Sequence, residues 1–273
     1  MDKKGVMIVG ALVLACTLSI SSAIAISGAQ PESHGQFPKA LDRGGLIQAK
    51  AGMKTKNTAE TDLPCPTDDL LALRRERIVD PNNYTFTTSK GFHGAVVDGV
   101  TYIEGYLIAN KTYALPQDYG DGLTSDTLSA FYAMQAGARA DGLSIYISSG
   151  FRSYNTQAGL YSRYVKRDGV EKADTYSARA GHSEHQSGLA FDVNIIDDSF
   201  IGTPEAIWLS DHCYEYGFIL RYPQGKTDET GYKYEPWHFR YVGTELAGIL
   251  YDGGNWITME DYFGITSQYQ EQE

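Results

Sequence analysis

The chain has 273 residues, a net charge of -11 at pH 7 and 42% hydrophobic residues, which is enough to bury one sizeable core. The acidic balance argues against a nucleic-acid partner, because phosphate binding requires clustered Lys and Arg side chains. Its 20 tyrosines and 29 glycines favour a loop-rich, strand-containing domain outside the cytoplasm. We expect a monomer.

The first 26 residues have the character of an export segment. Lys3 and Lys4 precede an apolar run that ends near Ile26 and is about long enough to span a hydrocarbon core. We expect an uncleaved signal-anchor, with the folded domain outside the bacterial cell membrane. Cleavage after the small residue Ala25 and lipidation at Cys16 are the alternatives. All three interpretations export the domain.

The remaining chain divides into three parts. Residues 27–100 are interpreted as a linker and a poorly defined N-terminal segment, because Gly, Pro, Gln, Lys and Thr occur with little apolar periodicity from about Ser27 to Pro66. Residues 101–264 form the predicted domain, and residues 265–273 are expected to be frayed. Cys213 lies on the apolar face of a predicted helix, which favours a buried thiol over a disulfide.

The predicted elements begin with a strand over residues 101–110. A helix capped by Thr124 and ended by Gly142 follows, and then a strand over residues 143–148. Ser153 caps a helix over residues 154–166. Arg152 therefore stands where a strand meets a helix, a rigid position for a long polar side chain, and Gln157 lies one turn inside that helix.

Two later segments carry the residues with chemical potential. His185 lies in a loop, and a strand follows in which Leu189, Phe191, Val193 and Ile195 should face the core while Ala190, Asp192 and Asn194 face a site.

The second segment is Glu235-Pro-Trp-His238. A regular strand would send Glu235 and His238 to opposite faces, so we expect an irregularity at Pro236-Trp237 that brings both to one side. A helix over residues 204–216, capped by Thr203, and a strand over residues 218–222 lie between the two segments. A last helix follows the capping box at Thr258.

Together, these segments offer two imidazoles and a carboxylate to a divalent metal. A second carboxylate lies three residues before the last histidine. This is the composition of a catalytic zinc site that keeps one open position. The sequence therefore predicts a zinc hydrolase.

Four blocks of this sequence resemble the VanY-type zinc D,D-carboxypeptidases, which are related to VanX-type dipeptidases and share a zinc fold with lysostaphin and hedgehog domains. The blocks are SGFRSYNTQ (149–157), YSARAGHSEHQSGLAFD (176–192), YGFILRYP (216–223) and YEPWHFRYV (234–242). The resemblance implies an α+β fold with a small antiparallel sheet, helices packed on it, and a zinc site in a cleft on the sheet. One departure is Ala180, where a proline is usual.

Carried over by position, the resemblance implies that His185, Asp192 and His238 bind Zn²⁺, one ion per chain. It implies that Glu235 is the general base and that Arg152 stabilises the charge developing on the scissile carbonyl oxygen. The two remaining assignments concern the substrate: Gln157 assists Arg152, and Ser183 helps to hold the terminal carboxylate.

The implied activity is removal of the C-terminal D-alanine from peptidoglycan stem pentapeptides, with a contribution to glycopeptide resistance as one biological role. An L,D-carboxypeptidase and a D,D-dipeptidase are alternatives within the same fold. A non-catalytic, zinc-stabilised wall-binding module is an alternative of another class. Glu235 and Arg152 favour an enzyme, because a structural zinc site needs neither a free base nor an oxyanion partner.

Overall fold

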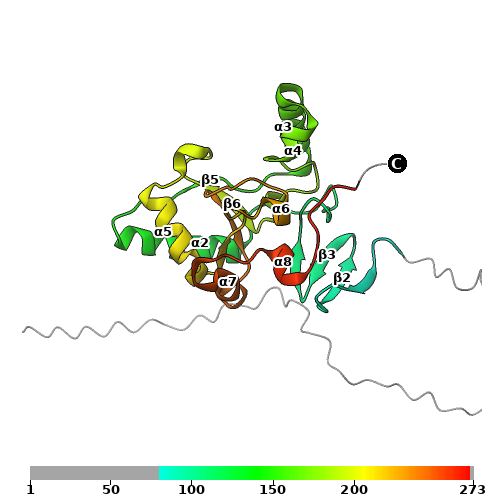
Figure 1. Ribbon diagram of the computed structural model, residues 1–273, viewed down its shortest axis with the longest axis horizontal. Helices are drawn as coiled ribbons and strands as arrows, with labels where there is room; N and C mark the ends of the chain where they lie inside the picture. The colour runs from blue at the N-terminus through cyan, green and yellow to red at the C-terminus, as the bar shows by residue number, and fades with distance from the viewer. Residues whose placement is uncertain (1–79, 271–273) are drawn as a thin grey trace, which may run out of the picture. The chain divides into compact units, whose positions relative to one another are not determined.

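In the computed structural model of this protein, residues 80–270 are described, and they form an α+β fold, as predicted (Figure 1). The strands are β1 (Tyr84–Thr87), β2 (His93–Val97), β3 (Val100–Ile103), β4 (Tyr106–Ile108), β5 (Ile147–Ser149), β6 (Ala190–Val193), β7 (Phe218–Leu220) and β8 (His238–Tyr241). The α-helices are α2 (Ser125–Ala140), α3 (Tyr154–Asp168), α4 (Val170–Asp174), α5 (Pro204–His212), α6 (Thr227–Thr230), α7 (Thr244–Tyr251) and α8 (Met259–Phe263). The 3-10 helices are η1 (Glu184–Ser187), η2 (Asp198–Phe200), η3 (Cys213–Tyr216) and η4 (Asp252–Gly254). The predicted signal-anchor lies outside the described residues.

The first sheet has the antiparallel order β1-β2-β3-β4, and it corrects two predictions. Residues 84–97, assigned to the linker and poorly defined segment, contain two strands that extend the sheet from β3. The single strand predicted over residues 101–110 is instead a hairpin, because Glu104 and Gly105 adopt positive φ angles of 48° and 86° and reverse the chain. The folded domain therefore begins before residue 101.

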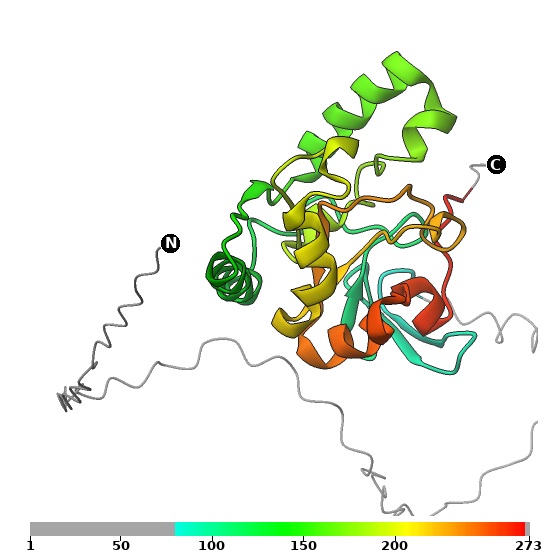
Figure 2. The ribbon, with the colours of Figure 1, turned by 60° about the vertical axis from the view of Figure 1, so that its left-hand side comes forward.

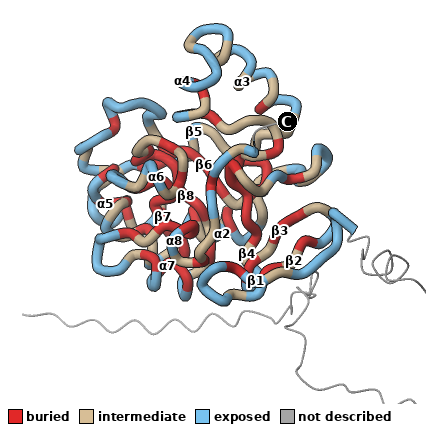
Figure 3. The backbone as a smooth tube through the Cα atoms, turned by 45° about the vertical axis from the view of Figure 1, so that its right-hand side comes forward, coloured by how far each residue is buried: buried red, intermediate tan, exposed pale blue. Residues whose placement is uncertain are grey.

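The second sheet has the antiparallel order β5-β6-β8-β7 and separates the core from the polar side of the domain. Phe191 of β6 and Phe239 of β8 are fully buried opposite each other and pack in the main core. The same core takes Phe131 and Met134 from α2, and Leu209 from α5. Figure 3 shows β6 and β8 as largely buried, and α3 and α4 as mostly exposed or half-buried. Because side chains alternate between the two faces of a strand, the other side chains of β6 and β8 point toward the polar side of the sheet.

The helix starts follow the predicted capping residues. The hydroxyls of Thr124, Ser153, Thr203 and Thr258 each accept a backbone N–H from the first turn of α2, α3, α5 and α8, respectively. Cys213 is a free, fully buried thiol, as predicted. The strand expected to continue to Ile195 ends at Val193, because Asn194 has a φ of 50°. Ile195 is consequently exposed rather than in the core.

Helices α3 and α4 form an arm that projects from the rest of the domain (Figures 1 and 2). Gln157 is the buried residue of α3, and Ala173 is that of α4. The arm therefore contributes little to the core, and its inner side is free to border a cavity. Within residues 80–270, no helix combines the length and the apolar character needed to cross a membrane.

The C-terminal segment was expected to fray, and up to residue 270 this prediction is wrong. Ser267 is buried, and its Oγ donates a hydrogen bond of 2.6 Å to the carbonyl oxygen of Thr230. The Tyr269 hydroxyl accepts the Arg179 N–H at 2.9 Å, and its ring lies edge-on to His182. Polar and aromatic contacts hold this segment, which is why apolar periodicity alone did not reveal it.

Ser267→Ala should lower the free energy of unfolding by about 1–3 kcal/mol, because the buried Thr230 carbonyl loses its donor. Gln268→Ala is the matched control, since the hydrogen bonds at this exposed neighbour use backbone atoms. Urea denaturation of the two variants measures the difference. Equal stability of both variants would mean that the hydrogen bond from Ser267 does not stabilise the fold.

Candidate metal centre and active site

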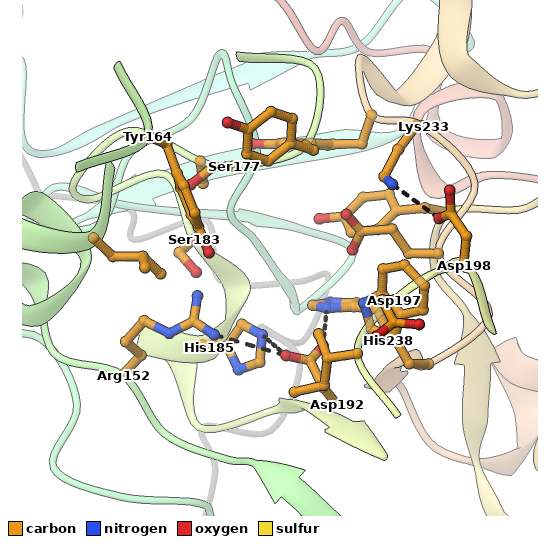
Figure 4. Close-up of a pocket in the computed structure, with 18 of the residues that line it drawn as sticks. Arg152, Tyr164, Ser177, Ser183, His185, Asp192, Asp197, Asp198, Lys233 and His238 are labelled. Atoms are coloured by element: carbon orange, nitrogen blue, oxygen red, sulfur yellow. Dashed lines mark hydrogen bonds and ion pairs between the residues drawn. The ribbon is translucent and has the colours of Figure 1, made fainter. Parts of the chain in front are cut away.

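The structure brings together the three residues predicted as metal ligands. Asp192 on β6 lies directly opposite His238 on β8 in the sheet register, and η1 carries His185 to the same place. Their ligand atoms all lie within 4.8 Å of one another, and all three residues are buried. Figure 4 shows the three side chains converging, with Asp192 between the two imidazoles.

The hydrogen bonds of His185 fix which nitrogen it can offer. Its Nδ1 lies 2.7 Å from the Gly150 carbonyl oxygen, which can only accept, so Nδ1 carries the proton and Nε2 is free to bind a metal. That Nε2 lies 3.2 Å from Asp192 Oδ2, and His238 Nδ1 lies 3.0 Å from Asp192 Oδ1. Ligand atoms at ordinary tetrahedral zinc distances lie about 3.3 Å apart, so the donor types and the spacing fit Zn²⁺.

The negative charge on the carboxylate of the ligand trio also suits a bound cation. Burial alone would raise the pKa of Asp192, but the neighbouring His185 and His238 outweigh it and hold that pKa well below its usual value. Asp192 is therefore an ionised carboxylate in a buried setting. A divalent ion at this point would offset a charge that is otherwise costly to bury.

Glu235 lies just before β8, at the irregularity predicted from Pro236. Residues 236 and 237 form a turn, the His238 N–H donates to the Glu235 carbonyl oxygen at 3.2 Å, and Glu235 and His238 line the same cavity. Burial raises the pKa of the Glu235 carboxyl to about 8, with His238 opposing the rise and Asp192 adding to it. A carboxyl with such a pKa can exchange a proton near neutral pH.

In the chelated protein, this raised pKa should make stability depend on pH. The pKa of this carboxyl rises from 4.5 in the unfolded chain to about 8 in the fold. Its contribution to the free energy of unfolding is therefore present in full below pH 4.5 and is lost as pH rises toward 8. The loss should reach at most about 1.4 kcal/mol per pH unit. Urea denaturation with chelator between pH 5 and 8 should show that the free energy of unfolding falls less steeply with pH in Glu235→Gln than in the parent. Identical slopes would contradict the assignment.

Arg152 lies between β5 and α3, as predicted, and points into the site (Figure 4). Its Nη1 donates to Gln157 Oε1 at 2.8 Å, and its Nη2 donates to Ser149 Oγ at 2.9 Å. The same Nη2 lies 3.7 Å from Asp192 Oδ2. These contacts fix the guanidinium beside the ligand trio while its side chain stays 20% exposed, which leaves it accessible to a bound molecule.

Gln157, predicted to assist Arg152, and Ser183, predicted to hold the substrate's terminal carboxylate, have different positions. Gln157 is 1% exposed, and its Nε2 donates to the Ala178 carbonyl oxygen at 2.6 Å. It therefore supports Arg152 from behind and does not line the cavity. Ser183 lines the cavity, directly before η1. Its hydroxyl can therefore face a ligand.

The cavity that contains these groups has a volume of about 730 Å³, which is ample for a short peptide. Tyr222 and Trp237 line it beside the ligand trio. Its rim carries paired charges, including Lys233 with Asp198 at 3.0 Å (Figure 4). Arm residues form another side of the rim: Leu160, Tyr164, Arg167, Asp168 and Lys172.

Sequence analysis did not identify the buried ion network beneath the site. Glu184 Oε1 accepts from Arg221 Nε at 2.8 Å and from Arg240 Nη1 at 2.9 Å, and Arg221 also pairs with Glu260. All four side chains are at most 2% exposed. One signal was present in the sequence: Arg240 follows His238 by two residues, so the strand period places both on one face.

This chain is similar to several known carboxypeptidases. A family model described as "VanY: D-alanyl-D-alanine carboxypeptidase" matches residues 120–244. YodJ of Bacillus subtilis (strain 168), named as a candidate carboxypeptidase, is 32% identical over 249 residues, covering 80% of this chain and 89% of YodJ. A D-alanyl-D-alanine carboxypeptidase of Enterococcus faecium is 36% identical over 141 residues, covering 51% of this chain and 43% of the relative.

Among solved structures, the LD-carboxypeptidase LdcB is similar at 37% sequence identity with a TM-score of 0.56, covering 70% of this chain and 97% of LdcB. The fold is therefore that of the LdcB-type peptidases. The chain belongs to the VanY family of D-alanyl-D-alanine carboxypeptidases, which confirms the resemblance seen in its sequence. It is a peptidase, and the non-catalytic alternative loses its support.

Proposed function

We propose that this protein is a zinc-dependent carboxypeptidase that removes the C-terminal D-alanine from peptidoglycan stem pentapeptides. The observation that carries the proposal is the buried convergence of His185, Asp192 and His238 in one cavity with Glu235. A structural zinc site would have no use for a further carboxyl group beside it. We infer that this carboxyl group serves as the general base.

The ligand trio would hold Zn²⁺ through two imidazoles and one carboxylate. When bound, the ion supplies a Lewis acid that polarises a carbonyl group and lowers the pKa of water. Glu235 takes a proton from the attacking water and later delivers it to the departing amine. Its raised pKa suits both transfers.

Arg152 and Ser183 act on the peptide itself. The Arg152 guanidinium, held by Ser149 and Gln157, is preorganised to stabilise negative charge on the scissile carbonyl oxygen. Such a fixed donor gains most where water is partly excluded. Ser183 offers a hydroxyl to the terminal carboxylate. Because the chain is acidic overall, these local groups, rather than long-range attraction, must recruit an anionic substrate terminus.

An L,D-carboxypeptidase acting on tetrapeptides is the second candidate. It is favoured by the extent of the similarity to LdcB, of which the match covers 97%, compared with 43% of the Enterococcus faecium enzyme. Both reactions release a terminal D-alanine. They differ in the residue that precedes the scissile bond.

The proposed location is outside the cell, with the domain held at the membrane by the N-terminal apolar segment. The support is the pair of lysines before that segment and the linker composition that follows it. A tethered domain of this kind could reach wall peptides from the membrane surface.

Mass spectrometry of products from tetrapeptide, pentapeptide and D-lactate-ending stem peptides tests the proposal. The full chain with zinc should release D-alanine from the pentapeptide, chelation should abolish the release, and added zinc should restore it. Release from the tetrapeptide alone would establish the L,D activity instead. Release that persists through exhaustive chelation would overturn the zinc mechanism.

A further inference from the structure

One carboxylate oxygen of the buried ion network beneath the site faces a histidine and not an arginine. Glu184 Oε2 and His238 Nε2 are both buried, and within the described residues neither atom has a hydrogen-bond partner. The two atoms lie 3.5 Å apart. A movement of about 0.5 Å would bring them to ordinary hydrogen-bond distance. Two unpaired buried polar atoms that face each other point to one shared proton.

We propose that Glu184 is a positioning residue that accepts the Nε2–H of His238 and so directs the Nδ1 of that imidazole toward the metal. This rests on the proposed zinc site. An imidazole that donates from Nε2 can present Nδ1 to a bound ion. His238 Nδ1 lies 3.0 Å from Oδ1 of Asp192, and zinc would take the place of the Nδ1 proton there. Metal-binding histidines commonly have such a carboxylate partner.

The surroundings of Glu184 make it a rigid acceptor. Its other oxygen, Oε1, is held by Arg221 and Arg240. Arg240 donates in turn to the Leu107 carbonyl oxygen of β4 at 2.7 Å, while Glu260 of α8 accepts from Arg221 at 2.7 Å and 2.8 Å. Contacts from two sheets and a helix therefore fix the carboxylate, and with it the direction of Oε2.

Glu184 is also the chain neighbour of a metal-ligand candidate. Glu184 immediately precedes His185 on η1, so one short helix carries one metal ligand and the partner of another. The Nδ1 of His185 is fixed by Gly150. The two histidines should therefore bind the ion through different nitrogens, Nε2 for His185 and Nδ1 for His238.

The first test uses the full chain with ¹⁵N-labelled histidine and added zinc. Long-range ¹H–¹⁵N spectra identify the two imidazoles that respond to zinc and report which nitrogen of each carries a proton. We expect one protonated at Nδ1 and the other at Nε2. Two imidazoles both protonated at Nδ1 would overturn the role of Glu184, whereas no response to zinc would instead count against the proposed zinc enzyme.

The second test compares Glu184→Gln with Glu260→Gln by competition with a chromophoric zinc chelator. In Glu184→Gln the amide oxygen should stay with the arginines, so the amide N–H₂ faces His238 and disfavours its Nε2–H form. The Kd for zinc should rise about 10- to 100-fold. Glu260→Gln removes the same charge from the same network without touching His238 and should leave the Kd unchanged. An equal rise in both would assign the effect to network charge and overturn the proposal; if Glu184→Gln does not fold, the spectra of the parent decide.

Discussion

Glu235→Gln should lower kcat for D-alanine release by about 10²- to 10⁴-fold, the usual contribution of a general base, while zinc stays bound. The amide keeps the size of the side chain but cannot accept a proton from water. Since Glu235 is separate from the ligand trio, the substitution leaves both imidazoles and Asp192 in place. Product release measured by mass spectrometry, with zinc content measured in the same samples, checks both expectations.

Glu245→Gln is the matched control, because it makes the same Glu-to-Gln substitution at an exposed acid on α7. It should retain full activity. Loss of zinc from Glu235→Gln would show that Glu235 is a metal ligand. Retained turnover would remove it from the reaction altogether.

Arg152→Ala should lower kcat by about 10²- to 10³-fold, or ~3 kcal/mol in transition-state stabilisation. The substitution removes the guanidinium that lies beside Asp192 in the cavity. Arg152→Lys should recover only part of the rate, because an ammonium cannot reproduce the fixed fork held by Gln157 and Ser149. Steady-state rates with a stem pentapeptide measure the effect.

Arg163→Ala serves as the control, since Arg163 lies exposed on α3 at a position away from the cavity lining. It removes the same charge and should not change the rate. Thermal unfolding of both variants separates catalysis from stability. An Arg152→Ala enzyme with normal turnover would show that the reaction does not use this guanidinium.

The elements with strong local signals were predicted well. Thr124, Ser153 and Thr203 were recognised as helix starts because capping depends on a few adjacent residues. The alternation around Asp192 placed Phe191 and Val193 in the core for the same reason: periodicity is a local property.

Other features depend on contacts that sequence order does not show. The strands before residue 101 are short and partly exposed, so they lack the apolar alternation that marks a buried strand. Tyr269 is held by Arg179 and His182, which lie far from it in the chain. The burial of Gln157 behind Arg152 is likewise a tertiary property. Glu184 was missed because a charged residue is buried only when its partners surround it.

The antiparallel pairing of β6 with β8 also bears on how the protein would acquire its ion. Because main-chain hydrogen bonds set Asp192 opposite His238, two of the three ligands meet through the sheet itself. The polypeptide can thus fold first and take up metal afterwards, unlike small domains whose folding waits for zinc. Protein stripped of zinc by a chelator should therefore keep its fold and take up the ion again without refolding.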